Sequence, residues 1–193
     1  MESNKWDITT RILHIGLVIT ITFQLFDGIF IATPGVYLYL YLHEAVGVFA
    51  SVIILIHWLW SWANGSMATL YPWNYEGMYI VLAESKDMFT GKMPMQGNRI
   101  GISSFVHGLG LLAVTGMAIT GIIILFIMPG GHGAFSSLND FSWYMDFSGF
   151  HRDLSYLVWA YWIGHIGFSI AHQVKGNHIF EGIFYLYRTI VKP

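Results

Sequence analysis

Long apolar stretches dominate the hydrophobic and polar pattern of the chain and predict its main elements. A membrane-crossing helix takes about 20 apolar residues, and four stretches are long enough: 12–32, 40–62, 102–128 and 150–172. The first is too long for the core of a signal peptide and contains Asp27, so it is expected to be a retained span. The pattern predicts an all-α membrane protein with a bundle of four transmembrane helices.

The segments between these spans are short or carry their own pattern. The turn at 33–39 is short, so the first two spans are expected to be antiparallel neighbours. In the loop 63–101, the stretch "WNYEGMYIVLAESKDMF" predicts a helix on the membrane surface or under a partner, with Tyr75, Met78, Val81 and Leu82 on one side. The loop 129–149 is rich in aromatic residues, which fits an interfacial belt or a docking or lid segment. No internal repeat is found, and one domain is expected over residues 1–193.

Basic residues predict the orientation of these spans. With four spans, both termini lie on one side, and of the nine Lys and Arg residues only Arg152 falls on the other side. Positive charge accumulates on the cytoplasmic side of membrane proteins. Both termini and the loop 63–101 are therefore expected to be cytoplasmic, with 33–39 and 129–149 outside.

Composition supports the membrane class and narrows the chemistry. Of the 193 residues, 55% are hydrophobic and 10% are charged, against roughly 25% charged in soluble domains. No run of Lys and Arg indicates a nucleic-acid surface. The absence of Cys excludes disulfides, thiolate metal sites, Cys-ligated iron–sulfur clusters and covalent haem attachment. A redox cofactor would have to be held non-covalently, by His or Met.

Two histidines stand in the fourth apolar stretch, although a buried imidazole without a partner costs free energy. His151 and His165 are fourteen residues apart, which separates them by about 40° around a helix and about 21 Å along it. They therefore lie on one face, near opposite edges of a hydrocarbon core about 30 Å thick. Each needs a partner at its own depth.

Histidines in other spans supply these partners. His43 is expected at the depth of His151, and His14 at the depth of His165. Pairs of imidazoles on facing helices hold haem by its iron, and bundle cores are natural cofactor sites. His57 lies fourteen residues after His43, so geometry alone barely separates it from His14 as the partner of His165. The alternative is a His-lined ion or proton pathway. Such a pathway would carry acidic residues along its length, whereas here only Asp27 lies within a span.

Several short motifs carry a family resemblance across all four spans. They are "RILHI", "LHEAVG", "FVHGLG" followed by "VTGMAITG", and "GHIGFSIAH" after His151. In order and spacing, the chain resembles the prokaryotic di-haem cytochrome b superfamily. That superfamily includes bacterial cytochrome b561, the gamma subunits of formate dehydrogenases and the b-type cytochromes of nickel–iron hydrogenases.

The resemblance implies a location, cofactors and partners. It implies a multi-pass protein of the bacterial inner membrane, with an inner haem b between His14 and His165 and an outer haem b between His43 and His151. It implies electron transfer between membrane quinone, bound beside the inner haem, and a dehydrogenase, hydrogenase or other redox subunit. The direction of electron flow and the oligomeric state, a homodimer included, stay open. A membrane haem sensor or haem carrier is the alternative within the haem-binding class.

Further polar residues gain candidate roles from the same resemblance. Arg11 and Arg152 are candidates to meet haem propionates, and snorkelling to the interface is the alternative. His107 is expected near the quinone or a propionate, or in plain packing. The chain departs from the family at Ile15, where Trp is frequent, and at His57, where the family has a non-ligating Arg. That second departure favours His14 as the ligand and His57 as a residue that contacts a propionate.

Overall fold

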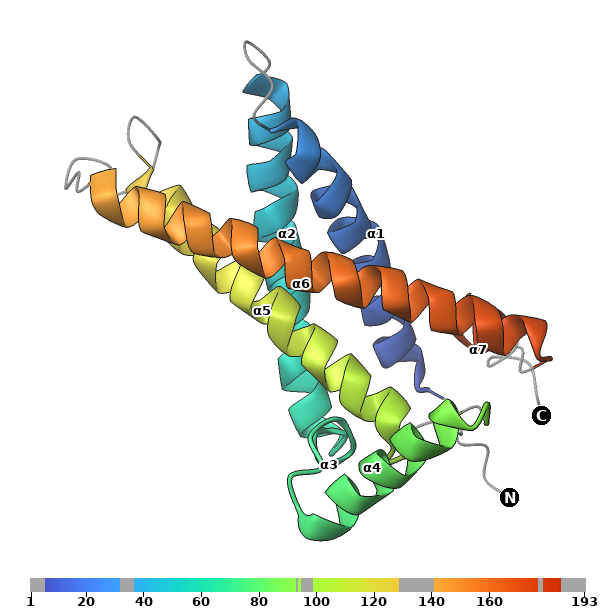
Figure 1. Cartoon of the computed structure of the whole chain (residues 1–193). Coiled ribbons are helices and arrows are strands. Elements are labelled where there is room, and N and C mark those ends of the chain that lie inside the picture. Colours follow the sequence, from blue (N-terminus) through green and yellow to red (C-terminus); the bar gives the residue numbers. More distant parts are fainter. Residues whose placement is uncertain are drawn as a thin grey trace. The chain divides into compact units, whose positions relative to one another are not determined.

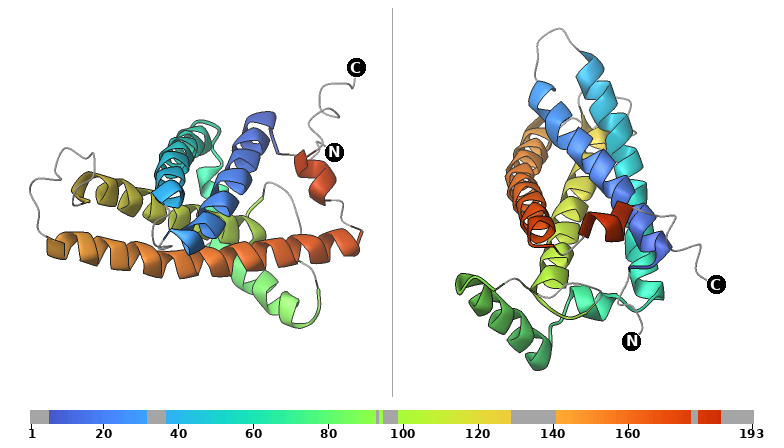
Figure 2. Two further views of the ribbon diagram at one scale, coloured as in Figure 1. Left: turned by 90° about the horizontal axis from the view of Figure 1, so that it is seen from above. Right: turned by 90° about the vertical axis from the view of Figure 1, so that its right-hand side faces the viewer.

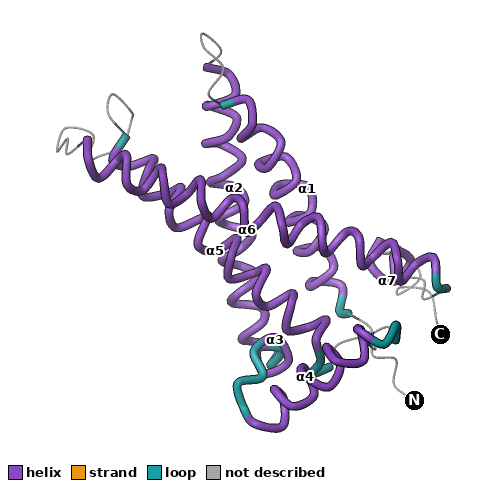
Figure 3. Tube along the Cα trace, in the orientation of Figure 1, coloured by secondary structure: helices purple, strands orange, loops and turns teal. Residues whose placement is uncertain are grey.

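The fold is entirely helical in the part of the chain that the computed structural model describes, residues 6–31, 37–92, 94, 99–128, 141–176 and 179–184 (Figure 3). Within these residues there is no strand. The helices in chain order are α1 (Ile8–Phe30), α2 (Tyr37–Ala63), α3 (Met67–Leu70), α4 (Tyr75–Phe89), α5 (Ile102–Ile127), α6 (Phe141–Val174) and α7 (Ile179–Phe184) (Figure 1).

Four of these helices are long and apolar enough to cross a membrane: α1, α2, α5 and most of α6. The prediction of four spans is confirmed. The start of the fourth was wrong, because residues 141–149 belong to α6 rather than to a loop. With 34 residues, α6 is about 51 Å long, which is longer than a hydrocarbon core about 30 Å thick. The part of the outer loop at 129–140 lies outside the described residues.

The chain divides into two compact units, and each contains a section of every long helix. Unit 1 comprises residues 1–15, 56–111 and 164–193, and unit 2 comprises 16–55 and 112–163. The buried apolar core of unit 1 includes Leu13, Leu70, Val81 and Leu111, and that of unit 2 includes Leu25, Ala50, Ile53, Val114 and Val158. The predicted pairs separate accordingly, with His14 and His165 in unit 1 and His43 and His151 in unit 2.

The distribution of exposed side chains fits a lipid environment. Large apolar residues on the long helices are exposed, for example Ile19 at 64% and Leu157 at 60%, whereas Thr20, Asp27 and Thr120 are buried. In lipid, apolar side chains contact the acyl chains, while polar side chains are satisfied between helices. The four long helices therefore have the surface of a membrane protein.

In unit 1, α4 confirms the helix that was predicted in the loop between the second and third spans. It begins after Asn74, whose side chain accepts a hydrogen bond from the Gly77 amide at 2.7 Å, as an N-cap residue does. The predicted side of the helix is not uniformly buried. Val81 is 4% exposed, whereas Tyr75 is 87% and Leu82 63% exposed. The apolar pattern predicted the helix, but not which of these side chains pack inward.

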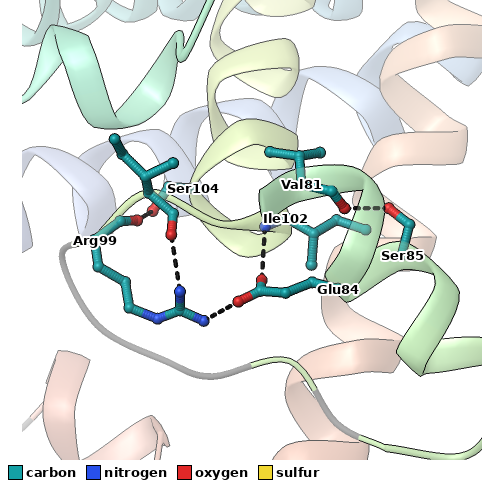
Figure 4. Close-up of polar contacts among 7 residues, drawn as sticks. Val81, Glu84, Ser85, Arg99, Ile102 and Ser104 are labelled. Atoms are coloured by element: carbon teal, nitrogen blue, oxygen red, sulfur yellow. Dashed lines mark hydrogen bonds and ion pairs between the residues drawn. The ribbon is translucent and has the colours of Figure 1, made fainter. Parts of the chain in front are cut away.

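The start of α5 is held by a carboxylate from α4 (Figure 4). Glu84 Oε2 accepts from the Ile102 amide at 2.9 Å, and Glu84 Oε1 pairs with the Arg99 guanidinium. Ile102 is the first residue of α5, where backbone amides lack helical partners and favour negative charge. At Gly101, an added Cβ would lie 2.7 Å from Glu84 Oε2, so a larger residue here would require the carboxylate to shift. The contact fixes the end of α5 that carries His107.

Replacing Glu84 by Ala is expected to destabilise unit 1 by about 2 kcal/mol, because it removes hydrogen bonds to a charged group and to a helix terminus. Thermal unfolding of the detergent-solubilised protein measures the change. Glu76→Ala is the control, since Glu76 lies on the same helix and is exposed. An equal loss in both variants would contradict the capping role of Glu84.

Three further contacts join the helix ends within unit 1. The Tyr71 hydroxyl donates to the Gly108 carbonyl at 2.9 Å, and its ring stacks on Trp58 with centroids 5.6 Å apart. Burial raises the pKa of Tyr71 to about 12, so the phenol stays neutral and can donate. Arg11 Nε donates to the Ile183 carbonyl at 3.2 Å, which ties α1 to α7 (Figure 2).

Candidate functional site

The predicted pair of unit 2 is brought together by α2 and α6. The ring centroids of His43 and His151 lie 6.2 Å apart, with an angle of 80° between the ring planes. The two side chains come from different helices, as their positions in the second and fourth spans predicted. Their rings lie edge to face and are not stacked.

A hydrogen bond from α5 fixes the tautomer of His151. Thr120 Oγ1 lies 2.7 Å from His151 Nδ1 and 2.8 Å from the Gly116 carbonyl oxygen. The carbonyl can only accept, so the hydroxyl donates to it and accepts the proton on Nδ1. The lone pair of His151 is then on Nε2, the atom left for a metal. A Cβ added at Gly121 would lie 3.3 Å from His151 Cε1, so glycine lets this ring lie close against α5.

Polar groups of α1 surround His43 in the same unit. Gln24 Nε2 donates to the His43 carbonyl at 2.7 Å, and Asp27 Oδ2 lies 3.6 Å from His43 Nδ1. Asp27 is 7% exposed. From the sequence, Asp27 was recognisable only as an acidic residue inside the first span. An ionisable residue in a transmembrane segment is itself a functional signal, because its burial in lipid is costly.

In unit 1, three histidines from three helices form a cluster. His14 of α1 lies 5.9 Å from His165 of α6 and 6.2 Å from His107 of α5, measured between ring centroids. His107 and His165 pack edge to face at 4.8 Å. The predicted pairing of His14 and His165 in space is therefore observed. His107, expected at this level of the third span, contacts both.

Hydrogen bonds and ring contacts also constrain the other polar residues of unit 1. His107 Nδ1 lies 2.7 Å from the Ser103 carbonyl oxygen, so Nδ1 carries the proton and Nε2 the lone pair. Its ring centroid lies 6.0 Å from that of Trp6. His57 Nδ1 lies 3.3 Å from Ser61 Oγ one turn along α2. The second-span histidine thus has a partner on its own helix.

The remaining candidates differ in burial. Arg11 is 5% exposed and sits one turn before His14 on α1, whereas the Arg152 side chain is 71% exposed and lies 3.8 Å from Asp153. His172 is buried at 4% exposure in the last turn of α6. His132 and His178 lie outside the described residues.

The ring separations suit a haem held by two histidines. Two metal–nitrogen bonds of about 2 Å each, plus about 1 Å from each nitrogen to its ring centre, place two such centroids roughly 6 Å apart. His43 with His151 at 6.2 Å and His14 with His165 at 5.9 Å match this value. His107 and His165 at 4.8 Å are too close for an iron between them. The donor sets therefore fit haem in both units.

Paired intramembrane histidines in a helical membrane protein are typical of b-type cytochromes. The family model for prokaryotic cytochrome b561 matches residues 5–185, and the chain belongs to this family. The protein is therefore a bacterial multi-pass membrane cytochrome of the b type, which binds haem b and acts in electron transfer. No curated protein and no solved structure matches the chain significantly.

Proposed function

We propose that the protein is a di-haem cytochrome b that passes electrons between a redox partner and the membrane quinone pool. One haem b is held in unit 1 by His14 and His165, and the other in unit 2 by His43 and His151. Haem iron supplies one-electron transfer by cycling between its ferric and ferrous states. The whole chain, residues 1–193, acts as one di-haem domain.

The observation that carries this proposal is that each predicted histidine pair has a metal-bridging separation, 5.9 Å in unit 1 and 6.2 Å in unit 2. In unit 1, His14 and His107 lie at a similar separation of 6.2 Å. In unit 2, the proton of His151 is held on Nδ1 by the contact with Thr120, which leaves Nε2 for iron. A single buried histidine would be explained by a helix–helix hydrogen bond. Two pairs, formed by three helices, are better explained by two cofactors.

We further propose that quinone exchanges electrons near unit 1, beside His107. His107 Nε2 retains a lone pair, since Nδ1 faces the Ser103 carbonyl, and an imidazole nitrogen can exchange a proton with a bound quinol. The distribution of Lys and Arg supports a cytoplasmic position for this end of the chain and for both termini. The electron partner is a dehydrogenase, hydrogenase or other redox subunit, and a homodimer is compatible with this assembly.

The test is the haem content and the quinol reactivity of the purified protein. We expect two haems b per chain in a pyridine haemochrome assay, reduction of both by quinol, and a quinone-site inhibitor that perturbs the unit 1 haem. A colourless protein would contradict haem binding and favour a His-lined ion pathway. Haem that quinol cannot reduce would favour a membrane haem sensor or carrier, and an inhibitor effect confined to the unit 2 haem would contradict the quinone position.

A further inference from the structure

We infer that Asp27 is a positioning residue that holds the His43 ring by its Nδ1–H and increases the basicity of this ligand. The inference rests on the proposed function, in which His43 ligates the unit 2 haem. It assigns a role to a carboxylate that is not one of the four proposed iron ligands.

The first support is that two buried polar atoms face one another across 3.6 Å. His43 Nδ1 and Asp27 Oδ2 are separated by this distance, and among the described residues neither atom has a hydrogen-bond partner. The gap is slightly too long for a hydrogen bond and too short for a water between the two atoms. An unsatisfied buried polar group costs about 1–3 kcal/mol. A small rotation of either side chain therefore lowers the free energy by forming the bond.

The second support is that two side chains of α1 reach the same residue of α2, His43. Gln24 and Asp27 are three residues apart, so they share a helix face. Gln24 fixes the backbone of His43 through a 2.7 Å hydrogen bond to its carbonyl. Asp27, one turn further, reaches the ring of the same residue. One face of α1 thus positions both the backbone and the side chain of this ligand.

The third support is chemical. A ligating histidine usually donates its second ring N–H to a carboxylate, carbonyl or water, which fixes the tautomer and raises the basicity of the ligand. The partner of His151 is the neutral hydroxyl of Thr120, whereas His43 faces a carboxylate. A carboxylate is costly inside a membrane span, and Asn or Ser could accept the same proton at lower cost. The carboxylate therefore indicates that His43 is a stronger electron donor to the iron than His151.

The experiment compares Asp27→Asn with wild type by redox titration of the membrane-bound holoprotein. A more basic ligand stabilises ferric iron, so its loss favours reduction. We expect the equilibrium constant for reduction of the unit 2 haem to rise about tenfold, which is about 59 mV for a one-electron couple. The ferric electron paramagnetic resonance signal of that haem should shift, and the unit 1 haem should keep its potential. An unchanged potential and signal in Asp27→Asn would overturn the inference.

Thr20→Val is the matched control, because it removes a buried polar group from the same helix whose hydroxyl bonds the Gly16 carbonyl of α1 rather than His43. It should retain the wild-type potential, and a shift equal to that of Asp27→Asn would overturn the inference. If Asp27→Asn loses the unit 2 haem, Asp27→Glu decides. Haem recovery with a near wild-type signal supports the carboxylate role, and loss in both variants overturns it. A wild-type protein without a unit 2 haem would instead refute the proposed function.

Discussion

Replacing His43 by Ala is expected to reduce the haem content from two to one per chain while leaving the spectrum of the other haem intact. Each axial ligand contributes one of two iron–nitrogen bonds, and among the described residues of unit 2, His43 and His151 are the pair of histidine rings that lie together. His151→Ala should have the same effect. The pyridine haemochrome assay and the reduced-minus-oxidised spectrum measure the loss.

The matched control is His172→Ala, which removes a buried histidine from α6 but lies outside both proposed pairs. It should keep both haems. Retention of two haems in His43→Ala would refute the assignment of the unit 2 ligands. Loss of both haems in His43→Ala with a folded protein would mean that the two units do not bind haem independently.

The long helices and the histidine pairs were predictable because both depend on local periodicity. Hydropathy over about 20 residues defines a span without reference to its neighbours. Once His151 and His165 share one face of a rigid helix, depth selects His43 as the neighbour of His151, whereas the choice of His14 over His57 for His165 depended on the family resemblance. The same logic explains why the start of α6 was missed. Residues 141–149 mix aromatic and polar side chains, so they lack the continuous apolar signal that defines a span.

Other features depend on the rotation of one helix against another, which spacing within a helix does not encode. The approach of Asp27 to His43 and the 4.8 Å contact of His107 with His165 are of this kind. So is the cap of α5 by Glu84, which joins residues separated by a loop. An acid inside an apolar span was the one available signal for Asp27, and it indicated importance without indicating the partner.

In unit 1, His14→Ala is expected to remove the haem, whereas His57→Ala is expected to keep it. His14 lies 5.9 Å from His165, which matches ligation of one iron from both sides, and the motif "RILHI" favours His14 over His57 as the ligand. Replacing His57 would then change the surroundings of the haem without removing a ligand. The His57 variant should therefore retain two haems per chain, with a shifted potential at most.

The position of His107 makes two further variants necessary. His107 is 6.2 Å from His14, so ring separation alone would also allow these two residues to ligate one iron. His165 is favoured because His165 and His151 lie on one face of α6, which presents both haems with a ligand from the same helix. His165→Ala should accordingly lose the unit 1 haem, and His107→Ala should keep it but slow its reduction by quinol.

Haem content, spectra and quinol kinetics of these four variants distinguish the arrangements. If His57→Ala loses the unit 1 haem and His14→Ala keeps it, spans two and four carry both haems. His14 then lies beside the haem without ligating its iron. If His107→Ala loses the haem and His165→Ala keeps it, α5 supplies the ligand. In either case the haem is held by histidines of unit 1, where His14, His107 and His165 from three helices lie within 6.2 Å of one another, and retention of the unit 1 haem in all four variants would contradict this proposed site.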